Sequence, residues 1–299
     1  MVMRNLIILS IYLVILTAGS ASAATLEAGE GQTYTTIQSA IDAAKDGDTV
    51  LVHEGTYAEN VRIKTGKISI IGEDKENTII DGGQKSSGLR IDEVNNIVIS
   101  GFTVQNSGGG GQEDAGVTIY KGNDNTISNM ILKNNSVGIS IFQGSNNNMV
   151  SGSFIESSSR YGIYIYASND NKIFNNNIRN NKIGIYADSA RTNRIYTNNL
   201  IENKDQAYDN SGVNSWDYEK TGNYWSNYKG SGEYVITPGG GKAKDNFPAS
   251  REFSIRSEPV PTQSAPQKED EAGKSTPGFT IFASISSLIV IEMIRKIRK

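Results

Sequence analysis

Residues 162–183 read GIYIYASNDNKIFNNNIRNNKI, and residues 184–205 read GIYADSARTNRIYTNNLIENKD. These two segments align without a gap, two earlier segments starting at Gly116 and Gly138 align with them, and a fainter copy starts at Gly88. The later glycines are 22, 24 and 22 residues apart, a period that indicates stacked structural repeats. Nine residues after each of the four later glycines stands an asparagine: Asn125, Asn147, Asn171 and Asn193.

The apolar residues within each repeat indicate short strands. Positions one and three after each glycine are mostly isoleucine or valine and alternate with polar or aromatic positions, which is the period of a strand with one buried face. Each repeat contains three apolar groups separated by Asn, Ser, Asp and Gly, so a coil of three strands and three turns fits. Leucine is scarce and no repeat has a 3.6-residue apolar period, which argues against leucine-rich or helical repeats. We therefore predict an all-β fold, a right-handed parallel β-helix of about 22 residues per coil, in which the four asparagines form one ladder.

The beginning of the chain predicts export and a capped β-helix. Residues 1–23 combine Arg4, an apolar run over 6–18 and the small residues Ala21-Ser22-Ala23, the pattern of a secretory signal peptide. Residues 24–250 form the predicted β-helix domain, and its segment 37–44 has apolar residues at helical spacing. A stack of coils exposes an apolar end, so we expect this short N-terminal helix to cover it.

The end of the chain predicts a linker and a membrane attachment. Residues 251–276 are rich in proline, serine and charge without apolar periodicity, which is typical of a disordered linker. Residues 277–299 start with Pro277-Gly278-Phe279, continue with an apolar run and end in basic residues. This segment is a short transmembrane candidate whose basic end would stay in the cytoplasm.

Three segments resemble known families. Residues 36–82, TIQSAIDAAKDGDTVLVHEGTYAENVRIKTGKISIIGEDKENTIIDG, resemble the opening of exported parallel β-helix proteins, pectin esterases among them. The repeats and the segment NSWDYEKTGNYWSNYKG at 214–230 resemble the NosD-like group, with its carbohydrate-binding-and-sugar-hydrolysis type repeats. The C-terminal tail resembles the archaeal Pro-Gly-Phe sorting signal, which implies that an archaeosortase removes the tail and a lipid anchor replaces it. Repeats of this kind define a fold well and a function poorly.

Composition narrows the classes of partner and cofactor. The formal charge is −3, and the body without its two basic ends is more negative, which argues against nucleic acid as a partner. The absence of cysteine excludes disulfides and thiolate metal sites. Copper is disfavoured, because the chain has a single histidine, His53, and Met130 and Met149 occupy different repeat positions. We predict no resident cofactor, while a calcium site of scattered aspartates stays open.

The outward positions of the predicted strands supply the candidate binding site. Two and four residues after the glycines, aromatic side chains recur on consecutive coils and favour sugar binding through their ring faces: Tyr120, Phe142, Tyr164, Tyr166 and Tyr186. Aromatic stacking that only stabilises the sheet would give the same pattern. We predict no catalytic residue, because Asp92 and Asp188 lie four coils apart in this column. Asp124 and Asp170 share a turn column two coils apart, so about 10 Å separates them, at the edge of the spacing in inverting glycosidases. Aspartates in turns usually only shape the turn, so we do not expect this pair to be catalytic.

These observations favour a non-catalytic protein of the cell envelope, exported, held at the cell surface and able to bind polysaccharide or glycan. The main alternative is a polysaccharide lyase, hydrolase or esterase on the same fold. A NosD-like role in copper or cofactor maturation is the second alternative. The sequon Asn134-Asn135-Ser136 additionally predicts that a glycan can be attached on a turn.

Overall fold

The computed structural model describes residues 22–109, 111, 113–237 and 243–255. All of them belong to one compact unit, Met1–Val260, whereas a second unit, Pro261–Lys299, lies outside them. The predicted signal peptide (apart from Ser22 and Ala23), the linker beyond residue 255 and the Pro277-Gly278-Phe279 tail are therefore also outside the described residues. Within the described ranges, no helix is both long enough and apolar enough to cross a membrane.

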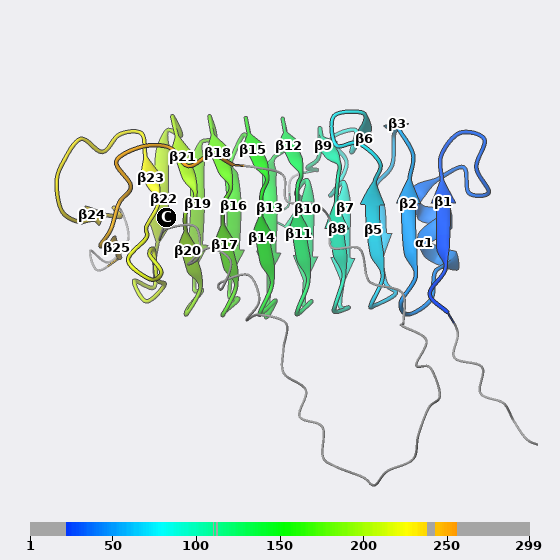
Figure 1. Cartoon of the computed structure of the whole chain (residues 1–299), viewed down its shortest axis with the longest axis horizontal. Helices are drawn as coiled ribbons and strands as arrows, with labels where there is room; N and C mark the ends of the chain where they lie inside the picture. Colours follow the sequence, from blue (N-terminus) through cyan, green and yellow to red (C-terminus); the bar gives the residue numbers. More distant parts are fainter. Residues whose placement is uncertain (1–21, 110, 112, 238–242, 256–299) are drawn as a thin grey trace, which may run out of the picture. The chain divides into compact units, whose positions relative to one another are not determined.

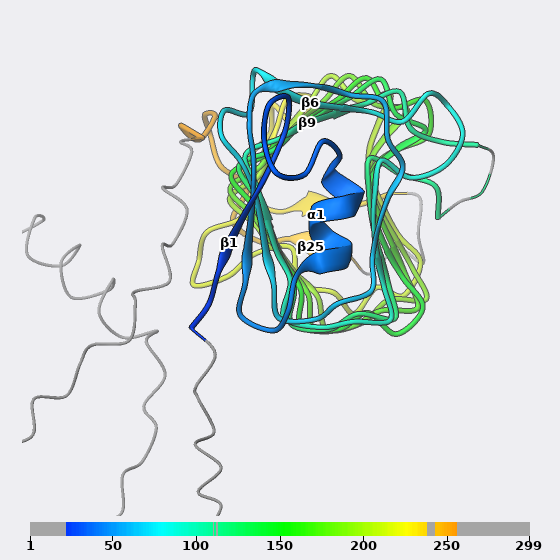
Figure 2. The same ribbon diagram turned by 90° about the vertical axis from the view of Figure 1, so that its right-hand side faces the viewer.

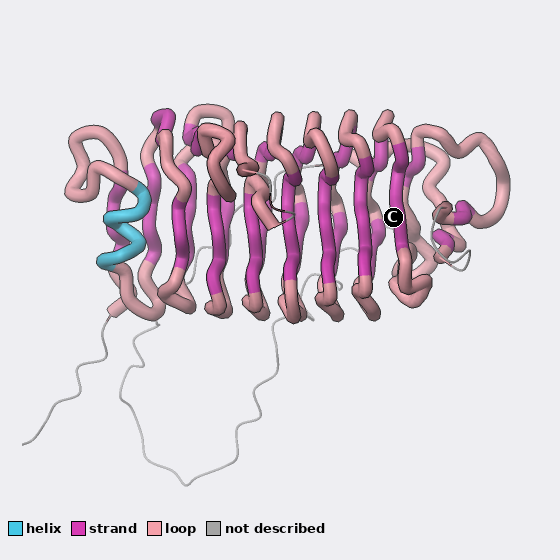
Figure 3. Tube along the Cα trace, turned by 180° about the vertical axis from the view of Figure 1, so that it is seen from behind, coloured by secondary structure: helices cyan, strands magenta, loops and turns pink. Residues whose placement is uncertain are grey.

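The strands form a parallel β-helix, as predicted. The chain visits three sheets in turn, and each strand pairs in parallel with the strand one coil before and one coil after it (Figures 1 and 3). Sheet A contains, in spatial order, β1 (Thr25–Ala28), β2 (Thr49–Val52), β5 (Ser69–Gly72), β8 (Val98–Ser100), β11 (Thr126–Ser128), β14 (Met149–Ser151), β17 (Lys172–Phe174) and β20 (Arg194–Tyr196). Sheet B contains β3 (Gly55–Tyr57), β6 (Thr78–Asp81), β9 (Thr103–Gln105), β12 (Ile131–Lys133), β15 (Phe154–Glu156), β18 (Asn177–Arg179), β21 (Asn199–Ile201) and β23 (Tyr224–Trp225). Sheet C contains β4 (Val61–Ile63), β7 (Leu89–Asp92), β10 (Val117–Tyr120), β13 (Val137–Phe142), β16 (Tyr161–Tyr166), β19 (Ile183–Asp188) and β22 (Asp205–Asp209). The strands β24 (Tyr234–Val235) and β25 (Lys244–Asp245) form a separate antiparallel pair.

Sheet C follows the register that the glycine columns predict. Ile139 pairs with Val117 on one side and with Ile163 on the other, and Ile163 pairs with Ile185. Their side chains are fully buried between the three sheets, where they belong to one continuous apolar core. Each additional coil therefore buries its apolar side chains only when its neighbours are present.

One end of the core is covered by the short helix α1 (Ile37–Ala43), seen across the coil in Figure 2. The Thr36 hydroxyl accepts a hydrogen bond from the Ser39 N–H and so caps the first turn. Ile37, Ala40 and Ile41 are buried in the same apolar core as the strands. At the other end Trp216 and Trp225 are buried, with ring centroids 5.8 Å apart, so large aromatics fill the core there.

The asparagine ladder exists, but the prediction that it contains Asn147 is wrong. The Asn125 amide donates to Asn148, Asn148 to Asn171, and Asn171 to Asn193, with N–O distances between 2.9 and 3.0 Å. Asn147 is exposed, and its φ of 58° places it in the left-handed turn beside the ladder. The turn Gln143-Gly144 contains one residue more than the matching turn in the next coil, which displaces the ladder position by one. Met149 and Phe154 stand eleven and sixteen residues after Gly138, as the core residues Ile173 and Ile178 do after Gly162, so the repeat alignment predicts both in the core. The same shift places Val150 and Ile155 there instead.

All three corners of the coil carry buried asparagines. A second ladder joins Asn176, Asn198 and Asn223, and a third joins Asn181 to Asn203. In each ladder the Nδ2 group donates toward the C-terminal end of the stack, while Oδ1 accepts from the preceding coil. The last acceptor of the first ladder is buried Asp209, which accepts from Asn214, and that of the second is buried Asp245, which accepts from the Asn223 backbone N–H. Each of these carboxylates also accepts an indole N–H, from Trp216 and Trp225 respectively, so the first two ladders end on carboxylates.

Candidate functional site

The outer side of sheet C carries a continuous aromatic cluster. The register aligns Tyr120, Phe142 and Tyr166 in one column and Tyr164, Tyr186 and Tyr208 in the neighbouring one. With Tyr161, these seven side chains form the surface that we call the aromatic face. All five predicted carbohydrate-binding residues therefore lie together on one sheet.

The rings of the aromatic face stack on one another along the coil axis. Phe142 lies between Tyr120 and Tyr166, with centroid distances of 6.4 and 4.9 Å and interplanar angles of 23° and 25°. The guanidinium of Arg90 lies 4.6 Å from the Tyr120 centroid on the side of the preceding coil. Because neighbouring groups lie on both ring faces of Tyr120 and of Phe142, these two side chains offer ring edges and the Tyr120 hydroxyl to a ligand. The expectation that sugars stack on open ring faces therefore does not fit Tyr120 and Phe142.

Tyr164 differs from the other predicted binding residues, because it is only 1% exposed. It packs against Tyr161, Tyr166 and Tyr186, with centroid distances between 5.0 and 6.0 Å. Burial raises its pKa far above the ordinary tyrosine value, and the nearby charge of Asp188 acts in the same direction. Tyr164 therefore supports the aromatic face from beneath, and its ring is not available for direct contact with a large ligand.

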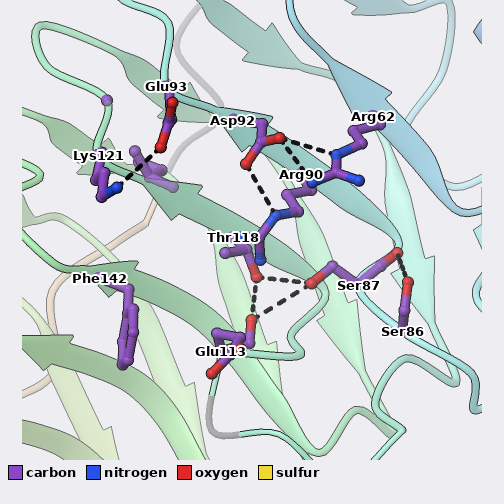
Figure 4. A network of polar contacts seen from close by, with 12 residues as sticks. Arg62, Ser86, Ser87, Arg90, Asp92, Glu93, Glu113, Thr118, Lys121 and Phe142 are labelled. Carbon is purple, nitrogen blue, oxygen red and sulfur yellow. Dashed lines mark hydrogen bonds and ion pairs between the residues drawn. The ribbon is translucent and has the colours of Figure 1, made fainter.

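A polar groove opens where the aromatic face meets the earlier coils. Figure 4 shows its charged side chains. Its volume is about 530 Å³, within the range of small-molecule binding sites. The lining combines planar polar side chains with two aromatic ones: Arg62, Arg90, Asp92, Glu93, Glu113, Tyr120, Phe142 and Gln143.

Two arginines and one aspartate form the floor of this groove. Arg62 and Arg90 stand next to each other on β4 and β7, and Asp92 follows two residues after Arg90. Arg62 donates through Nε and Nη2 to Asp92 Oδ2, at 2.9 and 2.7 Å, while Arg90 Nε donates to Oδ1 at 3.3 Å. Asp92 is thus fixed by both arginines, and the exposed part of Arg62 remains available to a ligand.

The loop before β10 forms one wall of the groove. The Glu113 carbonyl accepts hydrogen bonds from the Ser87 and Thr118 hydroxyls, which attaches the loop to the sheet. The Glu113 carboxylate has no hydrogen-bond or ion-pair partner within the described part of the chain. On the opposite side Glu93 pairs with Lys121 at 2.9 Å.

A family comparison identifies the type of protein. The family model described as periplasmic copper-binding protein (NosD) matches residues 29–230. The chain belongs to the NosD family. This confirms the resemblance of the repeats, whereas the resemblance of the tail to a sorting signal concerns residues outside the described ranges.

Several solved structures match this chain at low sequence identity. Pectin methylesterase from carrot is 14% identical, with 70% of this NosD-family chain and 72% of that chain covered and a TM-score of 0.44. Pectin methylesterase PemA from Erwinia chrysanthemi is 12% identical, with coverages of 75% and 85% and a TM-score of 0.43. Pectate lyase Pel9A is 14% identical, with coverages of 70% and 76% and a TM-score of 0.45. Comparison with curated proteins gave no significant match.

In the described part of this NosD-family chain, the donor atoms do not fit copper binding, the property that the family description names. Copper in proteins is held by Cys, His and Met, and the chain contains no cysteine. Both ring nitrogens of His53 face carboxylates at 3.2 Å, Nε2 toward Glu27 and Nδ1 toward Glu73. Met130 is fully buried in the core, while Met149 lies on the outer side of sheet A between Thr126 and Lys172. Among the described residues, no group of three or more His, Asp or Glu side chains is arranged to hold a metal ion.

The two aspartates that the sequence left as a possible pair lie in turns. Asp124 and Asp170 share one left-handed turn column with Asn147 between them, with φ values between 58° and 59°. Sequence reasoning missed Arg62, Arg90, Glu113 and Gln143 as groove residues. Arg90 stands two residues after Gly88, in the same column as the aromatic residues, and Arg62 is its partner in the coil before. Extending this column toward the N-terminus would therefore have found both arginines from the sequence.

Proposed function

We propose that this NosD-family protein binds a polysaccharide in the groove and along the aromatic face without cleaving it. The observation that carries this proposal is the position of Arg62, Arg90 and Asp92 at the end of a column of tyrosine edges. Planar polar side chains of this kind can bond to two neighbouring sugar hydroxyls at once. Tyrosine adds an apolar ring edge and a hydroxyl that donates and accepts.

The geometry of the coil supports a ligand that runs along the axis. Successive coils are separated by about 4.8 Å, so the column from Asp92 to Asp188 spans roughly 19 Å. One sugar unit of an extended polysaccharide is similar in length to one coil step. Each unit would therefore meet the same set of outward positions on the next coil.

Absence of catalysis is the second part of the proposal. Glycoside hydrolysis commonly requires two carboxyl groups, one that transfers a proton and one that acts as nucleophile or base. Asp92 has both oxygens engaged by arginine, and Glu93 is paired with Lys121. The specific observation that favours the alternative, a polysaccharide-active enzyme, is that Asp92 and Glu113 line the same groove.

The location of the protein and its independence from copper are also proposals. We infer export by residues 1–23 and attachment through the tail at 277–299, by a membrane span or by a lipid anchor that replaces it. Mass spectrometry of the protein from its own envelope tests both ends of the chain. A titration of the mature protein with Cu(I) and Cu(II) tests the metal, and stoichiometric tight binding would contradict the proposal.

The main experiment compares two arginines in matched surroundings. Arg90 lies over Tyr120 on sheet C, and Arg194 lies over Tyr218 on the outer side of sheet A, with centroid distances of 4.6 and 5.1 Å. The protein is screened against a panel of soluble neutral and acidic polysaccharides, and each is assayed for binding and for released fragments. Arg90→Ala should weaken binding about tenfold, a loss of about 1.4 kcal/mol, whereas Arg194→Ala should change it less than twofold.

Two outcomes would overturn the proposal. Equal losses in Arg90→Ala and Arg194→Ala, or no binding by the unmodified protein, would remove the groove as the site. Release of fragments that disappears in Glu113→Gln would establish the enzyme in place of the binder.

A further inference from the structure

We propose that Asn134 is the attachment point of an N-linked glycan, a modification independent of the glycan-binding function proposed for sheet C. Asn134 opens the sequence Asn134-Asn135-Ser136, the only Asn-X-Ser/Thr sequon of the chain with X other than proline. It lies in the turn between β12 and β13, at the corner where the chain passes from sheet B to sheet C. The argument rests on the surroundings of this asparagine, because a sequon alone is a weak signal.

The two asparagines of the sequon have opposite environments. Asn135 is buried, with Oδ1 accepting from the Ser107 N–H at 2.9 Å and Nδ2 donating to the Val104 carbonyl at 3.0 Å. Asn134 is exposed, and its amide makes no hydrogen bond to the part of the chain that the structure describes. Its φ of 56° turns the backbone outward at this corner. The Asn135 side chain is therefore hydrogen-bonded inside the fold, whereas the Asn134 Nδ2 group lies in solvent.

The space around Asn134 admits a sugar. The equivalent corner positions of the coils before and after are Asn106 and Ser157, both small, as the pairing of Lys133 with Gln105 and Glu156 shows. A hollow of about 440 Å³ lies beside Asn134 and is lined only by small or uncharged polar residues: Gln84, Ser107, Gly108, Asn134, Asn135, Ser136, Ser157 and Ser159. Hydroxyl and amide groups of this kind suit a neutral, hydroxyl-rich first sugar residue.

The chemistry is a glycosyl transfer with a lipid-linked donor. Asn134 Nδ2 attacks the anomeric carbon of an oligosaccharide carried on a polyprenyl phosphate or pyrophosphate. The bond between that carbon and the phosphate oxygen breaks, the lipid phosphate leaves with the electron pair, and Nδ2 loses one proton to the transferase. Export brings the chain to the side of the membrane where such a transfer can take place, so this proposal rests on the export inferred from residues 1–23.

The test uses the full chain purified from the cells that naturally export it. Cleavage after glutamate releases residues 114–156, which contain the sequon, and mass spectrometry of this peptide shows whether a glycan is present. The peptide should carry a glycan on Asn134 in the unmodified protein and in Ser136→Thr, and no glycan in Asn134→Gln or Ser136→Ala. Asn147, which is also exposed in a left-handed turn of the same peptide but lies outside any sequon, is the internal control and should be unmodified.

The variants separate the proposal from a folding defect. Ser136→Ala and Ser136→Thr leave Asn134 unchanged and alter only one partly buried side chain, so both proteins should be recovered in similar amounts. An unglycosylated peptide from the unmodified protein would overturn the proposal. A modification that persists in Ser136→Ala, or that appears equally on Asn147, would also overturn it.

Discussion

Removal of one rung from the first asparagine ladder should destabilise the protein strongly, and the change we consider is Asn171→Ala. The Asn171 amide donates to Asn193 Oδ1 at 2.9 Å and to the Ser145 carbonyl at 3.0 Å. Its Oδ1 accepts from the backbone N–H and the Nδ2 group of Asn148, at 2.9 and 3.0 Å. Alanine leaves three buried groups without these partners: the Asn148 N–H, one Asn148 amide hydrogen and the Ser145 carbonyl.

The magnitude follows from the cost of those three groups. Each buried polar group left unpaired costs about 1–3 kcal/mol, which gives about 3–9 kcal/mol for the set. We expect the lower part of this range, about 3–5 kcal/mol, because a water molecule can enter the vacated space and satisfy some of the groups. The total free energy of unfolding of a domain is typically about 5–15 kcal/mol, so the loss should be large.

The assay is equilibrium unfolding in urea, followed by circular dichroism and by the fluorescence of Trp216 and Trp225. Asn147→Asp is the matched control, because Asp124 and Asp170 already occupy the same left-handed turn in neighbouring coils. The control should change the free energy of unfolding by less than about 0.5 kcal/mol. If Asn171→Ala and Asn147→Asp differ by less than about 1 kcal/mol, the ladder does not stabilise the fold as argued.

Three further tests have expected outcomes. In Gly222→Ala the added methyl group would clash with the Asp245 carboxylate, so the free energy of unfolding in urea should fall by about 3 kcal/mol or more. The control Gly144→Ala adds a methyl group in open space at a left-handed turn and should lower it by about 1–2 kcal/mol. Tyr164→Ala should cost about 3–5 kcal/mol because it removes a buried ring, and Tyr208→Ala should cost clearly less; equal losses would contradict the burial argument. Burial raises the pKa of Asp245 above its ordinary value of 3.8, so the folded protein binds a proton that the unfolded chain has released. Stability from this residue should therefore rise as the pH falls toward 3.8, and a stability profile from pH 7 to pH 4 should lose this rise in Asp245→Asn.

The fold could be predicted because each coil repeats the same physical requirement. A glycine allows close approach of the next coil, as at Gly162, where an added Cβ would lie 2.6 Å from the Gly184 carbonyl oxygen. Apolar residues at fixed distances from that glycine must all point inward, so the glycine spacing is enough to align sheet C. Beyond a turn of variable length the alignment fails, which is why the single extra residue at Gln143-Gly144 misplaced Asn147, Met149 and Phe154.

The candidate site could be predicted only in part. The aromatic residues are visible in sequence because they share columns, but burial of Tyr164 depends on how neighbouring rings lean on it. The groove joins Arg62 to Glu113, and the second of these comes from a loop outside the repeat. Contacts between a repeat and an irregular loop depend on side-chain and loop conformation, which periodicity does not encode.

The one-way orientation of the asparagine amides has an architectural consequence. The coils that contribute Asn148, Asn171 and Asn193 each present an acceptor on one side and a donor on the other, so they are interchangeable at this corner. The carboxylates of Asp209 and Asp245 serve as terminators that fit only at the last coil. A 22-residue cassette such as 184–205 could therefore be duplicated or removed without redesign of either terminus. The length of the surface available to a bound polymer would then change in whole coil units. This length could therefore evolve without a change in the residues that close the two ends of the stack.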